Sequence, residues 1–161
     1  MQSHSRSIAR LGSIIAALVI SSTSAFAQAA THVGARLGFN TDTREAVLGL
    51  NLTVPISTRI EFYPSIDLYV PDRGNKVGFN GDVKVLLPLH SGPALFGGGG
   101  VALVNTNEGD FSNTDVGINL LVGIESKVGW IHPFGEVRLL LHNATQVALI
   151  AGVNFVFGGG R

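Results

Sequence analysis

The stretch RIEFYPSIDLYV, residues 59–70, alternates apolar and polar side chains along its length. Apolar residues occupy every even position from Ile60 to Val70, and Glu61 and Asp67 stand among the residues between them. Successive side chains of an extended strand point to opposite faces of a sheet, so the pattern predicts a strand with one apolar face and one polar face. The function of the chain depends on whether such apolar faces meet a protein core or lipid.

The same period-two pattern recurs along the chain, and no segment after residue 27 has a sustained helical spacing of apolar residues. We predict eight strands, at residues 32–40, 45–54, 58–70, 77–89, 94–105, 114–125, 132–142 and 146–157. These strands have 9 to 13 residues, whereas strands of soluble sheets usually have about five or six. A tilted strand needs about 9 to 11 residues to cross a bilayer, so the lengths favour membrane-spanning strands.

The predicted connections between the strands are of two kinds. Four connections are polar, at residues 40–45, 71–76, 105–113 and 142–146. Three shorter or more apolar connections alternate with them, at residues 55–57, 90–93 and 126–131. An up-and-down sheet would gather each kind at one end, which is the asymmetry that transmembrane barrels show.

Residues 1–27 precede this pattern and have the composition of a secretory signal peptide. Two arginines come before a largely apolar run of ten residues, and Ala25 and Ala27 form an A-x-A cleavage site. The apolar run is shorter than the ~20 residues of a membrane-spanning helix. We therefore expect a cleaved signal peptide and export through the secretory pathway. Cleavage after Ala29 and an uncleaved membrane anchor are the alternatives.

Cleavage after residue 27 leaves 134 residues, and residues 28–161 are expected to form one barrel domain with its strands within about 32–157. The remaining chain has 9 Lys and Arg against 11 Asp and Glu, a balance that gives no electrostatic case for binding nucleic acid. These charged residues are about 15% of the domain, below the ~25% of a typical soluble domain. The chain has no cysteine, which excludes a disulfide framework and a lipoprotein anchor.

The polar faces of the strands carry the charged residues together with Gly, Asn and Ser. A water-facing surface would be richer in long charged side chains, so we predict a confined polar interior that side chains fill, as in narrow barrels. The predicted interior charge network comprises Arg36, Arg59, Glu61, Asp67, Asp82, Lys84, Asp115, Glu125, Glu136 and Arg138. The apolar faces are predicted to contact lipid through Phe62, Leu68, Phe79, Leu120, Leu139, Phe155 and Phe157, among others.

Closure of the sheet follows from the same hypothesis. In hydrocarbon every backbone N–H and C=O must be paired, and among sheets only a closed barrel achieves this. Eight strands form the smallest usual closed set. We therefore predict that residues 146–157 pair with residues 32–40, with Val153, Phe155 and Phe157 toward lipid. The predicted fold class is all-β, a closed eight-stranded antiparallel up-and-down transmembrane barrel.

Two segments carry a resemblance to a known family. PFGEVR at residues 133–138, followed by three leucines, has a Pro-aromatic start and then an inward Glu and Arg, and four glycines at residues 97–100 follow Pro93. Over about residues 31–157 the chain resembles the small eight-stranded outer-membrane barrels of the OmpX type and the transmembrane domain of OmpA. The resemblance implies a monomer in the outer membrane, in contact with its lipids and lipopolysaccharide, and handled by the outer-membrane assembly machinery during biogenesis.

The end of the chain departs from the family pattern. Barrels of this family usually end on an aromatic residue, whereas residues 158–161 follow Phe157. We interpret the stretch Gly158–Arg161 as a short periplasmic tail, and we expect its deletion to leave folding intact. The resemblance carries over no peptidoglycan-tethering role, because that role belongs to a domain that follows the OmpA barrel.

The sequence assigns no catalytic residue, no cofactor and no metal site. Residues 142–145 only loosely resemble the His-x-Ser-Asn element of the lipid A deacylase, because the Ser is missing. No two of the histidines at predicted strand ends have ligand spacing: His32, His90, His132 and His142. We predict a non-enzymatic outer-membrane barrel protein with a structural or surface-interaction role. Its inward charges are predicted to plug a polar lumen, and a narrow ion path is the other interpretation of these charges. A soluble periplasmic β-barrel or sandwich binding protein is the alternative function, and a lipid A-modifying enzyme is the third.

Overall fold

The computed structural model of the protein describes residues 30–71, 74–90, 92–108, 111–142 and 145–157. The expected signal peptide and the tail at residues 158–161 lie outside the described residues. Within the described residues, no helix has the length and apolar character to cross a membrane.

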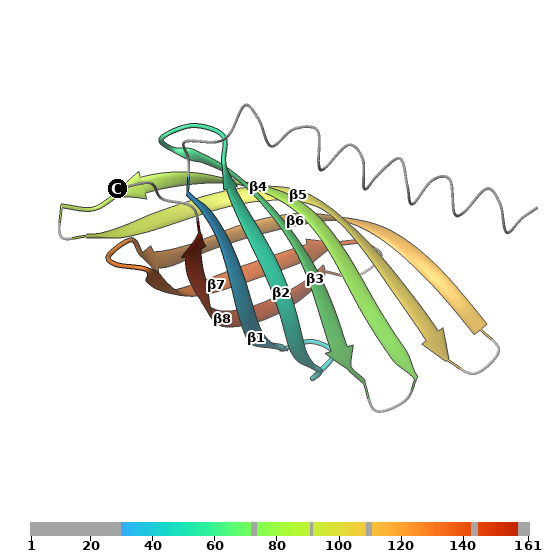
Figure 1. The fold of residues 1–161 in the computed structure, drawn as a ribbon. Coiled ribbons are helices and arrows are strands. Elements are labelled where there is room, and N and C mark those ends of the chain that lie inside the picture. The colour runs from blue at the N-terminus through green and yellow to red at the C-terminus, as the bar shows by residue number, and fades with distance from the viewer. Residues whose placement is uncertain (1–29, 72–73, 91, 109–110, 143–144, 158–161) are drawn as a thin grey trace, which may run out of the picture.

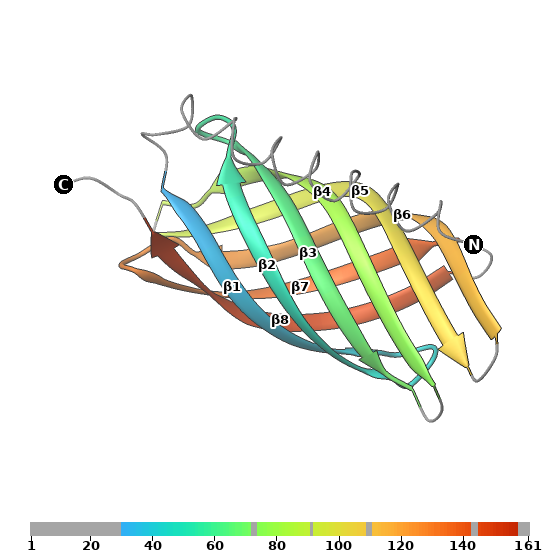
Figure 2. The same ribbon diagram turned by 45° about the vertical axis from the view of Figure 1, so that its right-hand side comes forward.

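In the described part of the chain, eight antiparallel strands form one closed barrel in the order of the chain. Figures 1 and 2 show this barrel from two directions. The strands are β1 (Thr31–Asn40), β2 (Ala46–Pro55), β3 (Ile60–Val70), β4 (Asn75–Pro88), β5 (Pro93–Glu108), β6 (Phe111–Ser126), β7 (Ile131–Leu141) and β8 (Thr145–Phe157). Each strand pairs with its successor, and β8 closes the barrel on β1, from Thr31 opposite Phe157 to Asn40 opposite Ala148. The predicted fold class and the predicted closure of the last strand on the first are confirmed.

The up-and-down topology separates the connections into two ends (Figure 1). We call the end with the β2–β3, β4–β5 and β6–β7 connections the turn end, which also holds the start of β1. The opposite end, with the β1–β2, β3–β4, β5–β6 and β7–β8 connections, is the loop end.

The β5–β6 hairpin is longer than the sequence predicts. The prediction of a polar loop over residues 105–113 is wrong, because the two strands stay paired out to Glu108 opposite Phe111. Polar side chains join across this extension, where the Asn105 Nδ2 donates to Thr114 Oγ1 at 2.9 Å. Apolar alternation is needed only where a strand face meets a core or lipid. A polar stretch beyond the apolar part of the barrel can therefore remain a paired strand.

The alternation along the strands places apolar side chains on the outside of the barrel. All seven residues predicted to contact lipid are on this outward face: Phe62, Leu68, Phe79, Leu120, Leu139, Phe155 and Phe157. Phe62, Leu120 and Phe157 are 41%, 46% and 58% exposed. Phe155 is half-buried, since its ring lies against Trp130 with centroids 6.0 Å apart.

The glycine run of β5 lets two strands of the barrel wall approach closely. A Cβ atom at Gly98 or Gly100 would overlap a backbone carbonyl oxygen of β4, that of Val83 or Gly81. These two glycines share the inward face of β5 with Phe96 and Ala102, which are buried. The run therefore has a packing role in the barrel wall.

Candidate functional site

The interior of the barrel is the candidate functional site, because the buried charged side chains of the strands converge there. Eight of the ten residues of the predicted charge network lie in it, none more than 4% exposed: Arg36, Glu61, Asp67, Asp82, Lys84, Glu125, Glu136 and Arg138. Their contacts divide them between a central cluster and a cluster near the turn end.

The central cluster consists of Arg36, Tyr63, Ser65, Asp67, Asn80, Asp82, Asn119, Glu136 and Arg138. Arg36 forms a fork with Asp67, through Nε to Oδ1 at 2.8 Å and Nη2 to Oδ2 at 2.5 Å. Its Nη2 also donates to Ser65 Oγ at 2.7 Å. A fork of this kind fixes both side chains in one geometry and is among the strongest hydrogen-bonded pairs in proteins.

Arg138 organises the other half of the central cluster. Its Nε donates to Glu136 Oε1 at 2.9 Å, and its Nη2 lies 2.9 Å from Asp82 Oδ2. Two amides connect this half to the Arg36 half. Asn119 Nδ2 donates to Asp82 Oδ1 at 3.0 Å and to Asn80 Oδ1 at 2.9 Å. One polar network therefore crosses the lumen.

The turn-end cluster consists of Glu61, Lys84, Glu125 and Lys127. Lys84 Nζ lies 3.2 Å from Glu61 Oε2 and 3.4 Å from Glu125 Oε2. Lys127 Nζ lies 3.0 Å from Glu61 Oε1 and 3.2 Å from Glu125 Oε2. Each lysine thus contacts both carboxylates, so the four charges balance and neither pair depends on one partner alone.

Polar contacts also occur toward the loop end of the interior. Lys76 Nζ lies 2.8 Å from Glu45 Oε2 and stands over the ring of Tyr69 at 4.6 Å from its centroid. Asn40 Nδ2 donates to Gln146 Oε1 at 2.8 Å. Side-chain contacts therefore connect the wall at three levels of the barrel.

Two residues of the predicted network lie elsewhere. Arg59 is exposed in the β2–β3 connection, because β3 starts at Ile60 rather than at the predicted residue 58. Asp115 is half-buried on β6, and its Oδ2 accepts a hydrogen bond from Asn113 Nδ2 at 3.1 Å. Asp115 thus contacts the polar extension of the β5–β6 hairpin through Asn113 and lies outside the central cluster.

Two lysines of the interior lie outside the predicted charge network. Lys76 lies at the predicted loop boundary, and Lys127 lies in the β6–β7 connection and reaches back to the carboxylates of the barrel. The predicted network holds six acids and four bases, and this excess of acid was the available signal for missing cations. The interior also contains apolar groups, including the cluster of Leu86, Phe96 and Leu121, so its lining is not uniformly polar.

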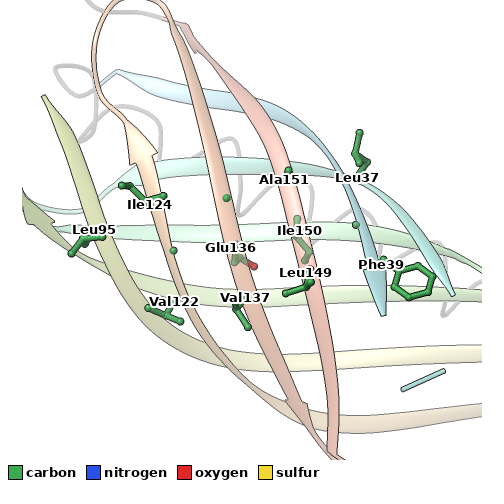
Figure 3. A pocket seen from close by; sticks show the side chains of 13 residues that line it. Leu37, Phe39, Leu95, Val122, Ile124, Glu136, Val137, Leu149, Ile150 and Ala151 are labelled. Atoms are coloured by element: carbon green, nitrogen blue, oxygen red, sulfur yellow. The ribbon is translucent and has the colours of Figure 1, made fainter. Parts of the chain in front are cut away.

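A groove of about 700 Å³ lies on the outer face of the barrel. Figure 3 shows its lining side chains, which come from β1, β5, β6, β7 and β8. Small residues, Gly135 and Ala151, lie among larger apolar ones such as Leu37, Val122 and Leu149. Almost all of this lining is apolar, so the groove offers no arrangement of groups for acid–base or nucleophilic chemistry.

Ser65, which points into the barrel from β3, belongs to the central cluster. Its Oγ accepts hydrogen bonds from Arg36 at 2.7 Å and from Asn80 Nδ2 at 3.1 Å. A catalytic serine needs a general base that takes its proton. The two contacts of Ser65 come from donors, so they position the hydroxyl as an acceptor.

No known protein-family model matches the sequence, and no curated protein sequence matches it significantly. The fold matches solved structures. The N-terminal β-barrel domain of OprF from Pseudomonas aeruginosa has a TM-score of 0.70 and 13% sequence identity, over 81% of this chain and 98% of that one. Neisserial surface protein A has a TM-score of 0.59 and 12% sequence identity, over 80% of this chain and 95% of that one.

Two further structures extend the comparison. Ail, the attachment invasion locus protein of Yersinia pestis, gives a TM-score of 0.53 at 8% identity, over 80% of this chain and 95% of that one. A de novo designed transmembrane β-barrel has a TM-score of 0.59 at 12% identity, over 81% of this chain and 97% of that one. The natural proteins are described as a barrel domain, a surface protein and an attachment protein, and a designed chain shares the fold, so the fold does not specify one activity. The chain has the fold of the small eight-stranded outer-membrane β-barrels.

Proposed function

We propose that the protein spans the outer membrane as a monomeric barrel, with a non-enzymatic structural or surface-interaction role. The observation that carries this proposal is the inversion of the usual order: charged side chains are buried inside, and large apolar side chains are exposed outside. The proposed surroundings are outer-membrane lipids and lipopolysaccharide, reached through the secretory pathway and the outer-membrane assembly machinery.

The apolar exterior supports lipid as the partner of the outer face. Every strand contributes exposed large apolar side chains, for example Leu37, Leu50, Leu68, Phe79, Val101, Val122, Val137 and Leu149, all at least 40% exposed. Contiguous apolar patches above a few hundred Å² are rare on soluble monomers. A surface of this kind around a whole barrel matches the apolar band of transmembrane barrels.

The polar interior supports a lumen that side chains plug along most of its length. The central cluster joins side chains from β1, β3, β4, β6 and β7 through hydrogen bonds and ion pairs. Two phenylalanine rings add bulk to the interior. The ring of Phe96 fills the space beside Gly123, and the ring of Phe134 fills the space beside Gly152. A barrel of eight strands is just wide enough for side chains to fill it, so the interior stabilises the wall.

Membrane fractionation, combined with gel migration of unheated and boiled samples, tests this function. The protein should be found in the outer-membrane fraction, and unheated protein should migrate differently from boiled protein because the closed barrel resists detergent. A version without residues 2–27 serves as the control and should stay in the cytoplasm. Recovery of the full chain as a soluble periplasmic protein, with no heat-dependent shift, would overturn the proposal.

Mass spectrometry of lipid A tests the non-enzymatic part separately. Cells with and without the protein should have the same lipid A acylation pattern. A mass difference that corresponds to the loss or gain of an acyl chain would identify a lipid A-modifying enzyme instead, and would leave the membrane location intact.

A further inference from the structure

We propose that His32, Glu125 and His132 form a binding site for a divalent transition metal ion of the Zn²⁺ class, at the turn end of the barrel interior. The three side chains come from β1, β6 and β7, and their nearest ligand atoms all lie within 4.8 Å of one another. The sequence alone predicts no metal site, because His32 lies far along the chain from Glu125 and His132.

The burial of the three residues separates them from ordinary surface histidines and acids. His32 and His132 are each 6% exposed, and Glu125 is 1% exposed. The two imidazole rings meet edge to face, with centroids 4.8 Å apart. Buried polar atoms normally have partners, so each nitrogen in this group needs an account.

Among the described residues, the two Nδ1 atoms find no hydrogen-bond partner. They are buried, on His32 and on His132. The other nitrogen of His132, Nε2, lies 3.1 Å from the carbonyl oxygen of Gly129. A carbonyl only accepts, so Nε2 carries the proton and the lone pair of His132 is on Nδ1. Metal-binding histidines commonly donate their second N–H to a backbone carbonyl in this way.

The two carboxylate oxygens of Glu125 have different partners. Oε2 contacts the lysines of the turn-end cluster, Lys84 at 3.4 Å and Lys127 at 3.2 Å. Oε1 accepts a hydrogen bond from Asn154 at 2.9 Å and lies 3.7 Å from His132 Nδ1. The lysines therefore hold one oxygen, and the other lies beside the Nδ1 of His132.

The ligand set favours Zn²⁺ over the alkaline-earth ions. Two imidazoles and a carboxylate suit Zn²⁺ and similar ions, whereas Ca²⁺ and Mg²⁺ prefer oxygen ligands. Tetrahedral ligands of Zn²⁺, at about 2.0–2.2 Å, lie about 3.4 Å apart. The three side chains would therefore close by about 1 Å around the ion. Three protein ligands leave a fourth position for water.

A cavity of about 520 Å³ gives access to this group from the turn end. Its lining includes His32, His132, Glu61 and Lys127. Lys127 is the more solvent-accessible lysine of the cluster, with 21% of its side chain exposed, against 1% for Lys84. Both lysines carry the same sign of charge as the ion, and Lys127 also lines the cavity. We therefore expect Lys127 to lower the affinity of the site for Zn²⁺.

Isothermal titration with ZnCl₂ tests the proposal, on the full chain purified in detergent without a polyhistidine tag. One Zn²⁺ should bind per barrel, and His32→Ala and His132→Ala should each weaken binding at least tenfold. His90→Ala is the matched control, because His90 is an exposed histidine at the same end of the barrel. Heat-dependent gel migration of each variant shows whether the barrel has folded.

A second measurement on the unaltered protein does not depend on the folding of variants. In ¹⁵N NMR of the imidazoles, Zn²⁺ should shift the Nδ1 resonances of two histidines while the Nε2 proton of His132 stays in place. Absence of stoichiometric binding, unshifted imidazole resonances, or equal weakening by His90→Ala and His132→Ala would each overturn the site. These outcomes leave the membrane proposal untouched, because that rests on the outer face.

Discussion

The central cluster and the turn-end cluster both bury charges in the same lumen, but they satisfy them differently. In the central cluster, Arg36 has one carboxylate partner, Asp67, in a two-bond fork. In the turn-end cluster, Lys84 and Lys127 each contact both Glu61 and Glu125. Among the described residues, Arg36 has no second carboxylate in contact, whereas the lysines of the turn-end cluster share two.

This contrast indicates which part of the interior can tolerate a substitution. Removal of one partner from a buried pair leaves an uncompensated charge, which costs far more than the pair contributes. A redundant cluster keeps a partner for every charge after one deletion. We therefore expect the central cluster to determine stability, and the turn-end cluster to have the freedom to take a ligand.

The largest effect is expected from Arg36→Ala. The substitution leaves Asp67 buried without its fork, so the free energy of unfolding should fall by about 3–5 kcal/mol. Urea unfolding of the barrel in detergent or lipid vesicles measures this change. Arg59→Ala removes the same side chain from an exposed connection and should have no comparable effect. Equal losses in both variants would contradict the distinction between network and surface arginines.

A charge placed on the outer face should be the next most costly. Leu120 points outward on β6, opposite Gly99 and Leu139 of the neighbouring strands, so Leu120→Arg would bring a guanidinium to the apolar outer face. Such changes cost about 2–4 kcal/mol at the middle of a bilayer. The same unfolding experiment, performed in lipid vesicles, measures the loss. If the variant is as stable as the unaltered barrel in vesicles, the outer face does not contact hydrocarbon.

The third prediction enters the turn-end cluster. Glu125→Gln keeps the shape of the side chain but removes the charge that Lys84 and Lys127 share. Glu61 still contacts both lysines, so the loss should be about 1.5–3 kcal/mol, in the range of hydrogen bonds to charged groups. Urea unfolding compares it directly with Arg36→Ala. A loss that matches or exceeds that of Arg36→Ala would remove the contrast between the clusters.

The sequence predicts the barrel well because its strands obey a local rule. In a stretch such as residues 59–70, period-two alternation identifies both the strand and its two faces, and the pattern extends to β8 and its closure on β1. The rule fails where it has no physical basis. The β5–β6 extension carries no apolar face, so it reads as a loop although its backbone is paired.

The interior site is only partly predictable for a related reason. Alternation shows that Glu136 and Arg138 point inward, but it cannot show which charges meet, since contacts across the lumen depend on register and strand tilt. Lys127 lies outside any strand and reaches the cluster by its side-chain length. His32 and His132 become neighbours because β1 and β7 both pair with β8 in the closed barrel. Their rings then meet on the inner side of the wall.

Lys127→Gln should produce the smallest loss of stability and the most informative shift. Lys84 continues to contact both carboxylates, and Lys127 is partly exposed, so the free energy of unfolding should change by about 0–1 kcal/mol. The same change removes a positive charge beside the proposed metal site, so Zn²⁺ should bind more tightly to Lys127→Gln than to the unaltered protein. Isothermal titration of both proteins in one buffer gives the ratio of affinities. Weaker binding would mean that Lys127 positions Glu125 rather than opposing the ion, and a large loss of stability would show that the cluster is not redundant.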